Sequence, residues 1–174
     1  MRVVYILLAV LFFCSCKKKE NDTKGDLSNT VKEIKEKRVL YSFKSIDLRK
    51  IEDYILTVRK NDKFIIYSYV NVNDDRKNMR FSFNRKSKKL HWGPETFTMK
   101  NDEFLMKNIK KTFSFYWKGE SGCHQTQPVL FNKEYGVLGI YNSYGPDFVF
   151  LNEEIEKKDL LENVLISMEN FNPN

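Results

Sequence analysis

The stretch KFIIYSYVNVNDDRKNMRFSF, residues 63–83, decides the fold because strand-like sequence on either side flanks a turn. Residues 63–72 are rich in β-branched and aromatic side chains, which favour strands. The Asn-Asp-Asp triplet at 73–75 is typical of a turn. Residues 79–83 alternate apolar and polar side chains, so one face of that segment should be buried and the other solvated. The stretch therefore predicts two consecutive strands of an antiparallel sheet.

Similar short patterns recur along the rest of the chain, separated by turn residues such as Gly93-Pro94 and Gly145-Pro146. Short strands separated in this way favour an antiparallel meander, and we expect a sheet of roughly six to eight strands. The segments with a strand pattern are 39–43, 63–72, 79–83, 90–92, 96–99, 113–117, 129–131, 136–142 and 147–151.

Three segments instead carry a helical pattern. In residues 47–58, Leu48, Ile51, Ile55 and Val58 are spaced by three and four residues, which is the period of one helical face. The other two predicted helices are 101–111, which opens with the capping residues Asn101 and Asp102, and 153–168, which Asn152 caps.

The strand and helix patterns together predict the α+β class: an antiparallel, meander-like sheet with about three packed helices. No internal repeat or later boundary divides residues 39–174, so a single globular domain is expected there. Residues 28–38 have only a narrow apolar stripe, and they form either a marginal helix or more of the spacer that precedes the domain.

The N-terminal segment carries the pattern of an export signal. Arg2 is followed by Val3–Phe13, an uncharged apolar run of 11 residues. A membrane-spanning helix needs about 20 residues, whereas the apolar core of a signal peptide needs only about 7–15. The run therefore favours a signal peptide, which we place at residues 1–15.

The end of this run resembles a bacterial lipobox, because the small residue Ser15 directly precedes Cys16. Cys14 is the rival site, but the bulky Phe13 before it suits cleavage poorly. Phe13 also departs from the lipobox pattern, in which Leu is commoner three residues before the cysteine. The resemblance implies a diacylglyceryl group on the Cys16 thiol, cleavage before Cys16, and acylation of the new amine with a fatty acid such as palmitate.

A lipoprotein signal peptide also implies an address. Residues 16–38 would form a lipidated N-terminus and a charged tether, with membrane lipid as a partner through acylated Cys16. Lys17, rather than Asp, follows the cysteine. By resemblance to other lipoproteins, this favours a lipid-anchored protein of the outer membrane, with a periplasmic or a surface-facing orientation left open.

The charge of the chain does not point to nucleic acid. The formal net charge is +7, and part of the excess lies in the tether, which begins with the triplet Lys17–Lys19. A nucleic-acid-binding surface needs clustered basic residues on one face, whereas the remaining excess is spread along a domain rich in both signs. We therefore expect no nucleic-acid partner.

Cys123 is the one cysteine left in the predicted domain, and it lies beside His124 in a Gly-rich loop. A nucleophilic cysteine needs a base within hydrogen-bond reach, and His91 is a second candidate for that role. These three residues are therefore the candidate reactive groups, although a semi-buried loop thiol is the simpler explanation of Cys123. A structural zinc site needs four ligands, so no metal or other cofactor is predicted.

Four aromatic residues flank turns and are candidates for a binding platform: Trp92, Trp117, Tyr141 and Tyr144. Exposed rings with a polar rim can bind a sugar, a peptide or a protein. The alternative is that these rings fill the core.

Three functions stay open at this point. The first is a non-enzymatic binding lipoprotein that captures a protein, such as an immunity protein that neutralises a toxin. The second is a carbohydrate- or small-ligand-binding lipoprotein, which predicts a cleft lined by the four aromatic residues. The third is a cysteine-dependent enzyme, which predicts Cys123 and a histidine in one pocket.

Overall fold

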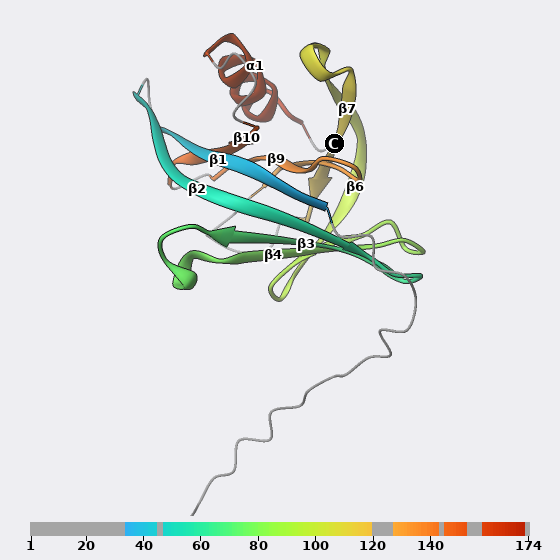
Figure 1. Ribbon diagram of the computed structural model, residues 1–174. Coiled ribbons are helices and arrows are strands. Elements are labelled where there is room, and N and C mark those ends of the chain that lie inside the picture. The colour runs from blue at the N-terminus through green and yellow to red at the C-terminus, as the bar shows by residue number, and fades with distance from the viewer. Residues whose placement is uncertain (1–33, 45–46, 120–126, 143–144, 153–157, 173–174) are drawn as a thin grey trace, which may run out of the picture.

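The computed structural model describes residues 34–44, 47–119, 127–142, 145–152 and 158–172, and its ten strands form a closed antiparallel barrel (Figure 1). The strands are β1 (Ile34–Lys44), β2 (Asp47–Lys60), β3 (Phe64–Asn71), β4 (Met79–Asn84), β5 (Leu90–Trp92), β6 (Glu95–Met106), β7 (Lys111–Trp117), β8 (Val129–Asn132), β9 (Gly136–Ile140) and β10 (Asp147–Leu151). The helices are the 3-10 turns η1 (Asp75–Lys77) and η2 (Lys107–Ile109) and the α-helix α1 (Lys158–Glu169).

Each strand pairs with its neighbours in the sequence, and β1 closes the barrel by pairing with both β2 and β10. The N-terminal part of β1 pairs with the C-terminal part of β2, where Ile34 lies opposite Val58. Closure leaves no strand with an unpaired edge.

Two apolar cores lie on the two sides of the barrel wall. The first fills the interior and consists largely of inward-facing side chains of β2, β3, β4, β8 and β9. The second lies outside the barrel, where α1 covers the outer faces of β9 and β10. In Figure 1, α1 lies over β10, and β3 and β4 form the opposite side of the barrel. Because β9 faces one core on each side, all five of its residues are buried.

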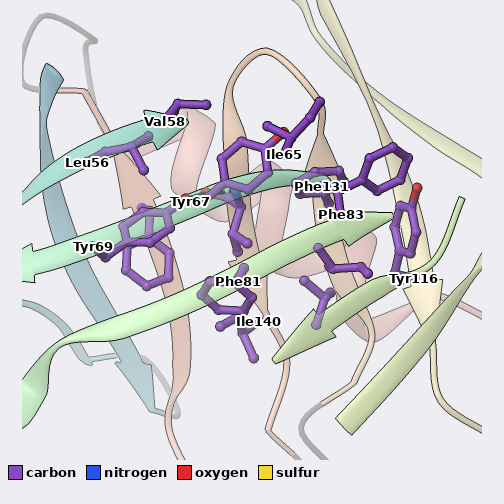
Figure 2. Close-up of a cluster of buried hydrophobic side chains, with 14 of the residues drawn as sticks. Leu56, Val58, Ile65, Tyr67, Tyr69, Phe81, Phe83, Tyr116, Phe131 and Ile140 are labelled. Atoms are coloured by element: carbon purple, nitrogen blue, oxygen red, sulfur yellow. Dashed lines mark hydrogen bonds between the residues drawn. The ribbon is translucent and has the colours of Figure 1, made fainter. Parts of the chain in front are cut away.

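Aromatic rings fill the interior (Figure 2). The Phe131 ring is the centre of one cluster, with its centroid 5.2 Å from that of Tyr67 and 5.5 Å from that of Phe83. Tyr69 packs edge-on against Phe81 at 5.7 Å. Edge-to-face and offset contacts of this kind add stability beyond the burial of area. Side chains readily fill the interior of an eight-stranded barrel, and a ten-stranded barrel is wider. The many large aromatic side chains of this chain therefore fill the wider interior.

The prediction of an α+β fold with three helices is wrong. Residues 47–58 lie in strand β2, which pairs with β1 on one side and β3 on the other. Within β2, the buried side chains are Tyr54, Leu56 and Val58, at the period of two that a strand requires. Ile51, a member of the predicted helical face, is 43% exposed. The helical spacing was incidental, and pairing on both sides decided the conformation.

The predicted helix at 101–111 is also wrong, since this segment comprises the end of β6, the short turn η2 and the first residue of β7. Met106 is fully buried against the outer core, whereas its neighbour Leu105 is 54% exposed. That alternation is the pattern of a strand with one covered face. Phe104 lies opposite Phe113 of β7. The hairpin therefore provides hydrogen-bond partners for the backbone N–H and C=O groups, which in a helix would bond within the segment.

The sheet has ten strands rather than the expected six to eight, but the other predicted segments overlap observed elements. The nine predicted strand segments all overlap strands of the barrel, and the predicted helix at 153–168 overlaps α1. Over residues 34–38, neither a helix nor a spacer is present, because β1 begins at Ile34. The predicted domain start at residue 39 thus falls inside β1.

Candidate functional site

A hollow of about 630 Å³ lies at one end of the barrel, where three turns meet: β2–β3, β4–β5 and β8–β9. We call this hollow and its lining the basic mouth. Its lining residues are Lys60, Asp62, Ile65, Phe83, Arg85, Lys86, Lys88, Lys133 and Glu134.

An asparagine side chain shapes each of the three turns. Asn61 Oδ1 accepts the backbone N–H groups of residues 63 and 64. Asn84 Oδ1 accepts the N–H groups of residues 86 and 87, both at 3.0 Å. Asn132 Oδ1 accepts those of residues 134 and 135, at 2.8 and 3.0 Å. An asparagine favours a tight turn when its side-chain oxygen accepts a hydrogen bond from the backbone N–H two residues later. The three turns therefore hold their charged side chains on a defined backbone.

The floor of the basic mouth is apolar and continuous with the interior core. Ile65 and Phe83 line it, and both are buried. Phe83 stacks on Phe131, as Figure 2 shows. The Lys133 ammonium lies 5.4 Å from the centroid of the Phe83 ring, within reach of a cation–π interaction. Because buried apolar side chains lie beneath the cations, the attraction of the cations for an anion is stronger than on a fully solvated surface.

Tyr67 connects this floor to the β8–β9 turn. Its hydroxyl donates a hydrogen bond of 2.6 Å to the backbone carbonyl of Lys133. Burial raises the pKa of Tyr67 well above its usual value, so the phenol stays protonated and remains a donor. The position of Lys133 is therefore fixed from inside the barrel.

Positive charge dominates the lining, with five basic residues against two acidic ones. Of the acidic residues, Glu134 is paired with Lys111 at 2.6 Å, and this hydrogen bond lowers the pKa of the Glu134 carboxyl. Arg85 donates to the backbone carbonyl of Asn61 at 3.0 Å. Lys86 and Lys88 are exposed, and neither has a carboxylate partner within the described part of the chain. Their charges are available to a ligand.

A second hollow, of about 280 Å³, adjoins the basic mouth and shares Lys133 and Glu134 with it. Hydroxyl groups of Thr112, Ser114 and Tyr116 line it together with apolar side chains. Burial raises the pKa of Tyr116 to about 12, so this hydroxyl is a neutral donor or acceptor. The two hollows together offer ammonium and guanidinium groups beside neutral hydroxyls, which suits the binding of an anion with polar substituents.

The predicted aromatic platform does not form from the residues that the structure describes. Trp92 stacks on Phe81 at 5.1 Å and belongs to the interior core. Trp117 packs 5.7 Å from Phe171 on the outside of the barrel, and Tyr141 packs against the same outer core. All three rings are half-buried, and the barrel wall separates the first from the other two. Tyr144 lies outside the described residues.

Of the three predicted reactive groups, the described residues include only His91. The His91 side chain contacts the Thr96 hydroxyl, with Nδ1 3.0 Å from Oγ1. Cys123, His124 and Cys16 lie outside the described residues. Within the described ranges, no group of three or more His, Cys, Asp or Glu side chains could hold a metal ion.

Sequence reasoning missed the basic mouth as a site. The turn at 84–89 is conspicuously basic in the sequence, and this was the one available signal. Lys60 and Lys133, by contrast, lie 73 positions apart in the numbering. Only the closure of the barrel brings them to the same hollow.

Comparisons with protein-family models, with curated proteins and with solved structures find no match. None of the helices in the described ranges has the length and apolar character needed to cross a bilayer.

Proposed function

We propose that this protein is an exported, lipid-anchored, non-enzymatic binding protein that captures an anionic ligand in the basic mouth. The observation that supports this proposal is the excess of unpaired cations over an apolar floor at the end of a filled barrel. The site is built from turns on a rigid scaffold, a common arrangement for binding sites.

Electrostatics favours an anion over a neutral sugar. Arg85, Lys86, Lys88 and Lys133 line one hollow, where their like charges repel one another. A bound phosphate, sulfate or carboxylate relieves that repulsion and gains charge-assisted hydrogen bonds. The volume of about 630 Å³ falls within the range that small-molecule sites occupy. The ligand class is therefore a compact anion, with phosphate as its simplest representative.

The test uses sn-glycerol 3-phosphate as the probe and calorimetric titration of the acylated protein in detergent. The mouth variant Lys86→Gln/Lys88→Gln removes two lining charges. The matched control Lys63→Gln/Lys89→Gln removes two exposed charges, one from the β2–β3 turn and one from the β4–β5 turn, without touching the lining. We expect the mouth variant to bind about tenfold more weakly or worse, and the control to stay within about twofold of wild type.

Failure of the wild-type protein to bind the probe, or an equal loss in both variants, would contradict this proposal. The anchor is tested separately by mass spectrometry of the mature N-terminus. We expect an acylated Cys16 in the wild type and its loss in Cys16→Ser. A native protein that begins at Met1 would overturn the anchor.

A second candidate function, capture of a protein partner, is favoured by exposed apolar side chains on β2, on β3 and directly after β3. Ile51, Val70 and Val72 are 43%, 40% and 59% exposed there. Apolar patches rimmed by polar residues are a feature of protein interaction sites. An immunity-type partner would have to cover these side chains. Co-purification of one protein with the wild type, and its loss with Val70→Lys, would favour this candidate over the first.

A further inference from the structure

We infer that the anionic ligand of the basic mouth is the headgroup phosphate of membrane lipid, and that the barrel rests this end on an anionic bilayer. This inference depends on the proposed function, because it names the ligand of the same site. It adds an orientation: the basic mouth faces the membrane to which the chain is anchored.

The first observation is where the chain enters the barrel. Ile34, the first residue of β1, lies opposite Val58. Lys60, two residues further along β2, lines the basic mouth. The proposed anchor at Cys16 is therefore joined to the barrel at the end that carries the basic mouth.

The second observation is the short distance that the tether allows. Seventeen residues separate Cys16 from Ile34, and they span at most about 60 Å even when fully extended. Confinement by a short tether keeps the attached end at a high effective concentration next to the membrane. The three lysines at 17–19 lie at the membrane side of this connection.

The third observation is the distribution of charge at the two ends. Beyond the lining, Lys63 and Lys89 are exposed in the turns that form the basic mouth. Each basic residue close to an anionic membrane surface raises binding roughly fivefold. At the opposite end, Lys77 is paired with Glu52 and Arg76 with Asp74. An anionic surface therefore attracts the basic mouth more strongly than the loop between β3 and β4 at the opposite end.

The chemistry of the lining matches a lipid phosphate. Lys86, Lys88 and Lys133 line the hollow at the barrel end. A phosphate diester projecting from the bilayer can enter from that side while its acyl chains stay in the membrane. The neutral hydroxyls of Ser114 and Tyr116 in the adjoining hollow can bind the polar part of the headgroup.

The experiment measures lysine accessibility on the acylated full-length protein bound to preformed vesicles. The vesicles consist of phosphatidylcholine alone or of phosphatidylcholine with phosphatidylglycerol. Amines are labelled briefly with a water-soluble acetylating reagent, and the modified lysines are quantified by mass spectrometry. A third sample contains phosphatidylcholine vesicles with sn-glycerol 3-phosphate in solution.

We expect phosphatidylglycerol to protect Lys86, Lys88 and Lys133 about threefold or more, while Lys50 and Lys77 at the opposite end keep the same labelling. Protection of the mouth lysines by both phosphatidylglycerol and the soluble phosphate also supports the inference. Protection by the soluble phosphate alone overturns it and leaves the proposed function standing. No protection in either sample overturns both. Equal protection of both ends by phosphatidylglycerol overturns the orientation.

The paired variants separate recognition by the basic mouth from diffuse surface charge. In Lys86→Gln/Lys88→Gln, protection of Lys133 should fall to the level in phosphatidylcholine alone. In Lys63→Gln/Lys89→Gln, Lys133 should lose less protection than in the mouth variant, because the lining cations remain. Equal loss in the two variants contradicts a specific role of the basic mouth.

Discussion

The two ends of the barrel use charged residues in opposite ways. At the basic mouth, cations outnumber carboxylates and two exposed lysines have no carboxylate partner among the described residues. At the other end, charged side chains of the β3–β4 loop (residues 72–78) form ion pairs with neighbouring charged side chains. The contrast separates charges that hold the chain in shape from charges that are left for a ligand.

The β3–β4 loop shows how completely side chains can satisfy a turn. Asn71 is buried, and its Oδ1 accepts the N–H groups of Asn73 and Asp74 at 2.8 and 2.9 Å. Its Nδ2 donates to Glu52, which also pairs with Lys77. Asp74 receives two hydrogen bonds from the Arg76 guanidinium, both at 2.9 Å. These charges of the β3–β4 loop are thus committed to the structure of the loop itself.

The basic mouth uses the same asparagine-capped backbone without the ion pairs. Asn84 accepts backbone hydrogen bonds in its turn, as Asn71 does in the β3–β4 loop. Lys86 and Lys88, however, form no ion pair with a carboxylate among the described residues. An exposed ion pair contributes little stability, so leaving these lysines unpaired has little effect on the fold. The protein can therefore keep a positive hollow at one end at little expense in stability.

The largest expected effect comes from changing the backbone beneath the basic mouth. Gly136 opens β9 at a φ of +93°, and a Cβ there would lie 2.6 Å from the Tyr69 hydroxyl. Gly136→Ala therefore adds backbone strain to a steric clash in the interior. We expect it to lower the free energy of unfolding by about 2–4 kcal/mol, measured by urea denaturation.

Gly93→Ala is the matched control, since Gly93 lies in the β5–β6 turn at the opposite end with a φ of +55° and open space around its Cβ position. Only the left-handed conformation opposes this change, at about 1 kcal/mol. Equal destabilisation by the two variants would show that the contact with Tyr69 contributes nothing.

A smaller effect is expected from removing the hydroxyl that holds Lys133. In Tyr67→Phe, the carbonyl of Lys133 loses a 2.6 Å hydrogen bond inside the barrel end. We expect a loss of about 1 kcal/mol in unfolding free energy, together with weaker binding of sn-glycerol 3-phosphate because Lys133 is no longer fixed. Thermal denaturation and calorimetric titration measure the two effects.

Tyr54→Phe is the counterpart at the other end, where the Tyr54 hydroxyl reaches the carbonyl of Lys77 at only 3.4 Å. Its cost should be about 0.5 kcal/mol, with unchanged binding of the probe. A larger cost for Tyr54→Phe than for Tyr67→Phe would reverse the expected order of the two ends.

The smallest effect concerns pH. The hydrogen bond from Lys77 lowers the pKa of the Glu52 carboxyl below its usual value. A lowered carboxyl pKa stabilises the folded state above the unfolded pKa, and this stability is lost as pH falls through the folded value. The difference in stability between wild type and Glu52→Gln should thus be present at neutral pH and disappear under acidic conditions below that value.

Glu134→Gln tests the same linkage at the basic mouth. Lys111 lowers the pKa of Glu134, but Glu134 is 74% exposed and lacks the second hydrogen bond that Asn71 gives Glu52. Its pH-dependent difference should be smaller than that of Glu52→Gln. Urea midpoints at neutral and acidic pH compare the two variants, and a larger dependence for Glu134→Gln would be the contrary result.

Local pattern alone identified the strands whose two faces differ, such as β4, where Phe81 and Phe83 are buried and Arg80 is exposed. It also identified α1, whose apolar face recurs at helical spacing. It failed for β2, because residues at 48, 51, 55 and 58 fit one helical face while 54, 56 and 58 fit one face of a strand. Pairing with β1 and β3 resolves that ambiguity, and pairing is a property of distant segments.

The candidate site shows the same division. From the sequence come the basic turn at 84–89 and the asparagines that favour tight turns, because both act over a few neighbouring residues. The gathering of Lys60, Lys88 and Lys133 around one apolar floor depends on strand order and barrel closure. Strand order and closure depend on which strands pair across the whole chain. Burial of the aromatic side chains in the interior stabilises one pairing arrangement over the others.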